Sequence, residues 1–259
     1  MNTFLDMLWV EMRKTLRSRM PLFTVLGSML MPFGVAFLVF VSRNPDISHK
    51  LGLVSAKATL MADAATTWPA YLTLIGEMIG AGGFFFFCLI LSWIFGREFS
   101  DGTLKDMLAV PVPRSRILLA KFAVSAAWSV GLSLVVVALS LLMGALIGLP
   151  GGSTAVILQG CLRALAVAGL TIVVVMPFAL FASIGRGYLL PVGVAVLVLI
   201  MANVVQVAGW GEYFPWAIPV FLSQPKLTLT AASYWVVFFT GLAGIAATYL
   251  WWKFSDQSR

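Results

Sequence analysis

The sequence predicts an all-α, polytopic membrane protein with six transmembrane helices in a single domain, residues 1–259. Hydrophobic residues make up 61% of the chain and charged residues only 10%, whereas about a quarter of the residues in a soluble domain are charged. Six apolar runs are long enough to cross the hydrocarbon core, which takes about 20 helical residues. Lysine and arginine also gather between alternate runs, as they do in the cytoplasmic loops of membrane proteins.

Residues 1–20 precede the first run and predict an interfacial amphipathic helix on the inner face of the membrane. Their large apolar residues recur at helical spacing, while Arg13, Lys14 and Arg17 fall elsewhere on the helix. The apolar positions are Phe4, Leu5, Leu8, Trp9, Met12 and Leu16. A solvated tail is the alternative, but a tail would not need tryptophan and leucine in helical register.

The six predicted spans follow in order at 21–41, 71–95, 117–149, 156–183, 188–210 and 231–252. The third is longer than a single crossing, so it must tilt or project into the cytoplasm. Pro177 and Pro191 predict kinks in the fourth and fifth spans. The segment 211–230 is too rich in proline to cross as a helix, yet too apolar for an ordinary loop. It predicts an outer re-entrant or interface-hugging hairpin, or packing over the outer mouth of the bundle.

The distribution of the 17 lysines and arginines predicts the orientation. With the N-terminus inside, twelve of them lie in cytoplasmic pieces and five in outer pieces. We therefore expect both termini in the cytoplasm of a multi-pass protein of the bacterial cytoplasmic (inner) membrane. The same rule explains the net charge of +7 better than binding to nucleic acid, for which no exposed basic stripe is present.

The most polar stretch, GREFSDGTLKDMLAVPVPRSRILLAK at residues 96–121, lies on the predicted cytoplasmic side between the second and third spans. Ser100 or Asp101 is expected to cap a helix of roughly ten residues. Leu104, Met107 and Leu108 then share one face. Two prolines, Pro111 and Pro113, end the helix because neither has a backbone N–H. From the residues alone, this helix is either a connector with basic residues at the headgroups or a docking helix for a cytoplasmic partner.

This stretch resembles the signature of the type-2 ABC exporter permease family, from which it departs by having Pro113 where serine is common. The matching residues are Glu98, Gly102, Thr103, Leu104, Leu108, Pro111, Val112, Arg114 and Lys121. The resemblance implies a permease subunit that pairs with a second copy, a homodimer, and with a separate cytoplasmic ABC ATPase, which binds the ATP and Mg²⁺. No lysine in this chain lies between a glycine and a serine or threonine, so the sequence predicts no P-loop of its own.

The resemblance further implies that the loop 98–113 holds the coupling helix. Arg97, Glu98 and Asp101 would then orient the loop. Three apolar residues of the helix, Leu104, Met107 and Leu108, would either fill a groove of the ATPase or anchor the helix to the bundle. The complete set of docking and coupling candidates is Arg97, Glu98, Asp101, Gly102, Thr103, Leu104, Met107, Leu108, Pro111 and Arg114.

Three polar residues inside the spans are candidates for a transport pathway. Glu77 is an acid at membrane depth, where a carboxylate usually faces a cavity or a partner; pairing with a base such as Lys57 is the alternative. Asn203 and Gln206, on the fifth span, either bond between helices or line a dimer axis. No cluster of residues predicts a catalytic or metal site. The rival hypotheses are a proton- or cation-coupled secondary transporter that uses Glu77 and a membrane anchor that only recruits a cytoplasmic protein.

Overall fold

The computed structural model describes residues 3–42, 66–109, 111–224 and 229–255, and every regular element in these ranges is helical. Six of its helical segments are long and apolar enough to cross a membrane. They cover Met20–Val41, Trp68–Ser100, Arg114–Ile147, Thr154–Ile184, Leu189–Val207 and Ala231–Phe254. The predicted fold class, all-α with six candidate transmembrane helices, is confirmed.

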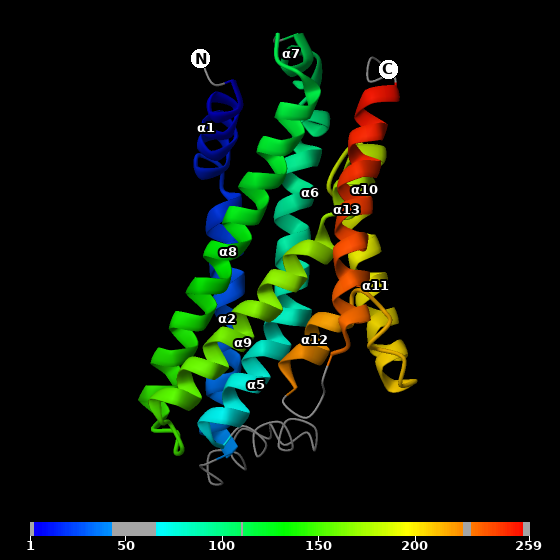
Figure 1. Ribbon diagram of the computed structural model, residues 1–259. Helices are drawn as coiled ribbons and strands as arrows, with labels where there is room; N and C mark the ends of the chain where they lie inside the picture. The colour runs from blue at the N-terminus through cyan, green and yellow to red at the C-terminus, as the bar shows by residue number, and fades with distance from the viewer. Residues whose placement is uncertain (1–2, 43–65, 110, 225–228, 256–259) are drawn as a thin grey trace.

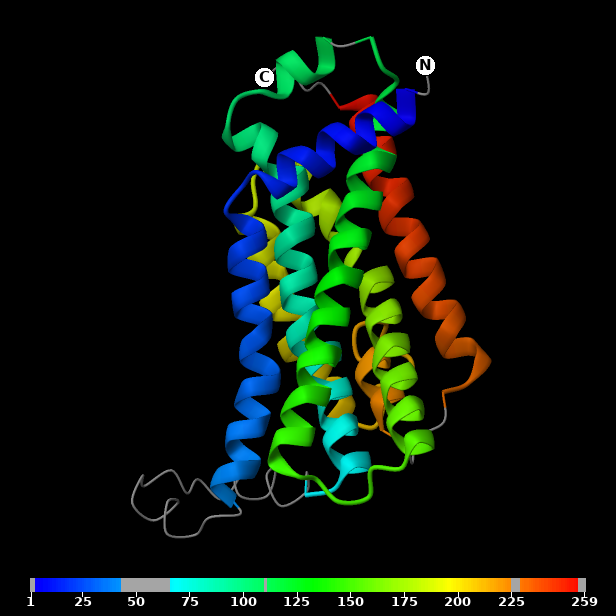
Figure 2. The same cartoon turned by 90° about the vertical axis from the view of Figure 1, so that its left-hand side faces the viewer.

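The chain begins with α1, Thr3–Leu16, which a short turn separates from the lengthwise helix α2, Met20–Ser42. Figure 2 shows α1 crossing the end of the bundle at a slant, where it packs against the start of the later helix α8, Arg114–Ile147. Some apolar residues of α1 face the bundle, and others face away from it. Leu8 and Met12 pack on the core, whereas Trp9 is 60% exposed.

The second candidate span consists of α5, Trp68–Met78, the π-helical turn η1, Ile79–Gly83, and α6, Phe84–Ser100. It extends further at both ends than the predicted range 71–95. The wide turn lies in the sequence IGAGG, where the lack of side chains lets neighbouring helices approach closely. A Cβ at Gly80 would lie 2.9 Å from a methyl carbon of Val220, and one at Gly82 would lie 2.9 Å from the methyl carbon of Met31.

After the short helix α7, Leu104–Ala109, the helix α8 runs for 34 residues, which is about 51 Å at 1.5 Å per residue. The next span breaks into α9, Thr154–Val175, and α10, Phe178–Ile184. Pro177 caps α10 at this break, as its missing N–H predicts. The indole of Trp216 donates to the carbonyl of Val174 across 2.9 Å beside the break. By contrast, Pro191 lies in the first turn of the unbroken helix α11, Leu189–Val207, where proline is tolerated.

The segment between α11 and the last helix, α13, Ala231–Phe254, folds back on the bundle through the six-residue helix α12, Ile218–Ser223. Ile218 and Ser223 are fully buried, and α12 packs against α9 and α5. Figure 1 shows the ends of the molecule clearly: the start of α1, the short α7 and the end of α13 all lie at one end of the bundle. A partner that bound α7 would therefore lie close to the start of α1 and to the end of α13.

Candidate functional site

Helix α7 is held between two tight connections. Asp101 follows the last residue of α6, and Gly102 has a φ of 69°, a left-handed conformation that glycine adopts without steric cost. The carbonyl of Thr103 then accepts the N–H of Met107 across 3.1 Å and begins the helix.

The helix starts later and is shorter than the sequence predicted. Ser100 belongs to α6 and Asp101 is its C-terminal cap, so neither caps α7. Six residues form the helix, Leu104–Ala109. Beyond it Pro111 is exposed, and Pro113 is the N-cap of α8 with an extended ψ of 133°. The two prolines thus lie outside α7, as predicted, but the second also fixes the entry into α8.

Two of the three apolar residues that the sequence placed on one face of α7 anchor it to the bundle. Leu104 is 7% exposed and Met107 is 8% exposed, and both belong to the main hydrophobic core. The side chain of Leu108 lies outside the described part of the structure. Of the two arrangements that the resemblance left open, Leu104 and Met107 have the one in which they pack on the bundle.

A buried cluster of charged side chains lies next to α7. Arg97 Nη2 is 3.1 Å from Glu11 Oε2, and Arg97 Nε is 3.2 Å from Glu98 Oε1. Lys121 Nζ is 2.8 Å from Glu98 Oε1 and 3.4 Å from Glu11 Oε2. Lys14 joins from the rim, 3.4 Å from Glu11 Oε1. The cluster thereby joins α1 at the start of the chain to α6 and α8, which come much later.

The cluster is almost completely removed from solvent. Lys121 and Glu11 are fully buried, and Glu98 is 2% exposed. Lys121 also donates to the carbonyl of Ile94 across 2.9 Å, and the guanidinium of Arg97 lies 4.8 Å from the ring centre of Trp93. Removing one member of a buried ion pair typically costs about 3–5 kcal/mol, because its partner is left charged and unpaired. The packing of α1 on α6 and α8 therefore depends on these charges.

An open groove of about 730 Å³ lies between α1, the end of α6 and α7. Lys14, Arg17, Arg97, Glu98 and Asp101 contribute charged groups to its lining, and Met7, Val10, Ser18, Trp93, Thr103 and Met107 complete it. Glu98 Oε2 is buried and has no hydrogen-bond partner among the described residues. A charged groove at this position suits contact with a polar partner surface.

Arg114 joins the start of α8 to the end of α13. Its guanidinium donates to the carbonyl of Trp252. The indole of Trp252 in turn donates to Ser183 Oγ across 2.9 Å, and its ring packs edge-on against Phe99. Among the predicted docking residues, Arg114 is therefore engaged within the bundle.

The three predicted pathway residues are not gathered into one cluster. Glu77 lies in α5 and accepts a hydrogen bond from Gln224 Nε2 across 3.4 Å, which ties it to the end of α12. Lys57, the alternative partner, lies outside the described residues. Asn203 is exposed on α11, where its amide donates to the carbonyl of Leu199 in the same helix. Gln206 is half-buried near the end of α11.

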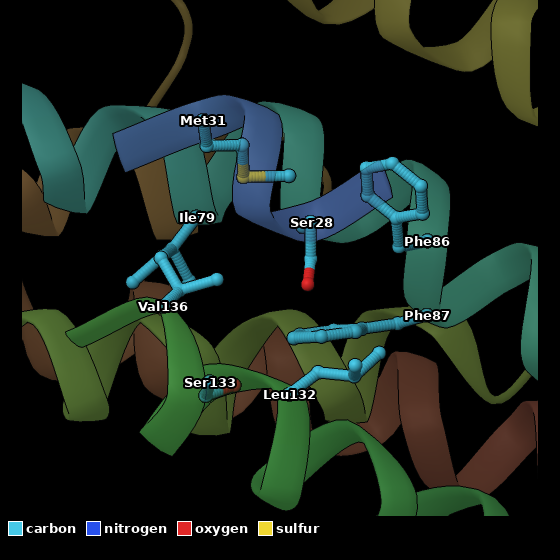
Figure 3. A pocket seen from close by; sticks show the side chains of 9 residues that line it. Ser28, Met31, Ile79, Phe86, Phe87, Leu132, Ser133 and Val136 are labelled. Carbon is cyan, nitrogen blue, oxygen red and sulfur yellow. The ribbon is translucent and has the colours of Figure 1, made fainter. Parts of the chain in front are cut away.

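A second, much smaller cavity of about 10 Å³ lies between α2, the η1–α6 junction and α8. Figure 3 shows the hydroxyl of Ser28 pointing between the helices, with Met31 and the rings of Phe86 and Phe87 around it. The volume suits about one water molecule, so this cavity cannot hold a transported molecule. In the described part of the chain, no group of three or more His, Cys, Asp or Glu side chains could hold a metal ion.

Comparison with known proteins identifies the class of this bundle. The sequence profile described as "ABC-2 family transporter protein" matches residues 7–203, a range that contains most of α1, the charged cluster, α7 and most of α11. The chain belongs to the ABC-2 family of transporters. The bacitracin transport permease protein BCRB of Bacillus licheniformis is 25% identical over 129 residues, which cover 50% of this chain and 62% of that protein. The chain thus matches less than two thirds of the length of this relative.

Family membership confirms the resemblance that the sequence 96–121 indicated: the chain is an ABC-2 permease with transmembrane helices. The member of its charged cluster that the sequence analysis missed is Glu11. The sequence did contain a signal that Glu11 is buried. Glu11 lies three residues after Leu8, so both share the face of the amphipathic helix that should be apolar. An acid on that face predicts a buried base opposite to it, and in this permease Arg97 and Lys121 supply the positive charges.

Proposed function

We propose that this ABC-2 permease is the transmembrane subunit of an ABC exporter in the bacterial cytoplasmic membrane, driven by a separate cytoplasmic ATPase that docks on α7. One observation carries the proposal. Helix α7 is anchored to the hydrophobic core by Leu104 and Met107, directly beside a buried ion cluster that joins α1, α6 and α8. A contact made at α7 therefore reaches three helices of the bundle.

The ATPase would bind ATP and Mg²⁺, and this chain would supply no cofactor site. Closure of the ATPase subunits would push on α7, and its anchor would pass the displacement to the ends of α6 and α8. Helix packings that interdigitate have discrete arrangements, so such a push changes the bundle between states. In the charged cluster, the carboxylates of Glu11 and Glu98 would exchange their basic partners during this change.

The proposed orientation has α7 and both termini in the cytoplasm, with α1 in the inner interface among lipid headgroups. The outward face of α1 supports this placement. Leu5, Trp9 and Leu16 are each more than half exposed, and Arg13 lies 4.8 Å from the ring centre of Trp9. Aromatic and apolar groups beside basic ones suit an interfacial helix. The turn 211–224 would then be a re-entrant hairpin that faces the outside.

The transport pathway is proposed to lie between two copies of the chain in a homodimer. Asn203, exposed on α11, supports this arrangement, because a polar amide at membrane depth is better placed in a cavity than against lipid tails. Gln206 would line the same route, and Glu77 would lie near its outer end. Because the related protein BCRB is named a bacitracin transport permease, bacitracin is the first transport substrate to test. Membership in an ATP-driven family does not favour the rival secondary transporter through Glu77.

The test is co-purification of the tagged protein from its native host in a mild detergent. We expect a P-loop ATPase in equal amount. The sharpest variant is Ala109→Trp, because Ala109 is exposed on α7 and a bulky ring there blocks a partner without disturbing the core. Ala208→Trp, at an exposed residue after α11, is the matched control. Loss of the ATPase with Ala109→Trp alone supports docking at α7. Normal recovery of the ATPase with Ala109→Trp, or no ATPase with the unmodified protein, counts against it.

A further inference from the structure

The end of the bundle opposite α7 contains a pocket whose chemistry the transport mechanism does not use. The first turns of α5 and α9 lie side by side there (Figure 1) and enclose an open pocket of about 180 Å³. Gly160 lets the two helices touch, since a Cβ at this residue would lie 2.5 Å from Leu72 Cδ1. The polar groups of the pocket come from Thr73, Gln159 and Arg163.

Arg163 lies within a candidate span, and none of the described residues supplies it with a counter-ion. It lies nine residues after the start of α9 at Thr154, which is about 14 Å along the helix. No hydrogen bond or ion pair joins its guanidinium to another of the described residues. In the cluster beside α7, by contrast, Arg97 and Lys121 each contact two carboxylates. An unpaired charge inside a span is costly, so it usually marks a ligand site.

The neighbours of Arg163 suit an anion. Gln159, one turn earlier on α9, has an amide that can donate. Thr73 already donates its hydroxyl proton to the carbonyl of Pro69 across 2.9 Å, so it leaves the anion to Gln159 and Arg163. Among the described residues, no acid lines the pocket. The planar guanidinium presents parallel N–H groups that match two oxygens of a phosphate. A phosphate monoester or diester therefore suits Arg163 and Gln159 better than a halide ion does, because a single halide cannot accept both parallel N–H groups of the guanidinium.

The surface beside the pocket indicates what carries the phosphate. Leu158 and Leu162 flank Arg163 on α9 and are 58% and 59% exposed, so the polar pocket borders an apolar surface within a candidate span. We propose that the pocket binds the phosphate-bearing headgroup of a membrane lipid, with the acyl chains against this leucine surface. The site needs no ATPase, and only its assignment to the outer leaflet depends on the orientation proposed above.

The test is a lipid titration of the purified protein in a non-ionic detergent, read by native mass spectrometry. The probe is phosphatidylglycerol, and diacylglycerol of the same chain length is its phosphate-free counterpart. We expect the wild-type protein to bind the phospholipid in preference. Arg163→Gln should weaken that binding at least about tenfold, as expected for the loss of charge-assisted hydrogen bonds. Arg116→Gln, which removes an exposed arginine at the opposite end of the bundle, should leave it unchanged.

Three outcomes would overturn the proposal. One is equal binding of phosphatidylglycerol by the wild-type protein and Arg163→Gln. Another is an equal loss with Arg116→Gln, which would mean that only net charge matters. The third concerns the source of the phosphate: displacement of the lipid by inorganic phosphate at equal concentration would make the ligand a soluble anion. Should Arg163→Gln fail to fold, the wild-type comparison decides alone, because equal affinity for diacylglycerol excludes a headgroup site.

Discussion

Replacing Lys121 by methionine should destabilise the protein by about 3–5 kcal/mol. The ammonium group of Lys121 is fully buried and contacts Glu98 Oε1 at 2.8 Å, Glu11 Oε2 at 3.4 Å and the carbonyl of Ile94 at 2.9 Å. Without it, two buried carboxylates share Arg97 as their remaining buried base. Methionine fills most of the space of the lysine stem, so the loss is electrostatic and not the result of a cavity.

The assay is unfolding in mixed micelles, with tryptophan fluorescence followed as sodium dodecyl sulfate is added. A double-mutant cycle with Glu98→Gln isolates the pair, and we expect a coupling energy of at least about 1 kcal/mol. Lys253→Met is the matched control at an exposed lysine in the last turn of α13, where a change within about 0.5 kcal/mol is expected. The reasoning is refuted if Lys121→Met costs no more than this control, or if Lys121→Met and Glu98→Gln are additive.

Three further predictions concern the packing of the bundle and one of the pathway residues. Leu104→Ala should lower the free energy of unfolding by about 2 kcal/mol and reduce the amount of ATPase that co-purifies. Full recovery of the ATPase would show that docking does not depend on the anchoring of α7 by Leu104. Gly244→Ala should cost about 1–3 kcal/mol in the same unfolding assay, because its Cβ would lie 2.5 Å from backbone atoms of Pro177. Gly34→Ala, with nothing within 4 Å, should be neutral or slightly stabilising, because alanine favours a helix more than glycine does. An equal loss of stability in both variants would show that the contact with Pro177 is not the cause. Glu77→Gln keeps an acceptor for Gln224, so we expect reduced transport with unchanged assembly; full transport would leave Glu77 a structural acid.

The bundle itself was predictable from the sequence because its signals are local. A helix that crosses a membrane must satisfy its own backbone and present about 20 apolar residues, and each of the six spans does so within one run. The break at Pro177 follows from one residue in the same way. The π-helical turn at Ile79–Gly83 was not foreseen. Its glycines lie where Val220 and Met31 approach closely from other helices, and such long-range contacts leave no signal in the local sequence.

The candidate site was predictable only in part, for the same physical reason. Its position beside α7 follows from the motif that contains Gly102 and Leu104. The burial of Glu11 does not, since its partner Lys121 is 110 residues away in the chain. Lys121 was expected at the headgroups as a base that follows the connecting stretch. Helical periodicity shows which side of one helix is apolar, but it does not show which residues of distant helices meet. The ion pairs of the cluster depend on that tertiary packing, so they could not be predicted from the sequence.

Charges at the junction of α1, α6 and α8 give this part of the bundle a property that an apolar contact would lack. Interdigitating apolar side chains already restrict how helices can shift, but the hydrophobic attraction between them is not directional. Ion pairs at 2.8–3.4 Å between Glu11, Arg97, Glu98 and Lys121 instead favour particular registers, since a small shift leaves a buried charge unpaired. Under the proposed mechanism, a displacement of α7 would therefore be absorbed as a change from one set of ion pairs to another. The free oxygen of Glu98, beside the charged groove, provides an acceptor for such an exchange.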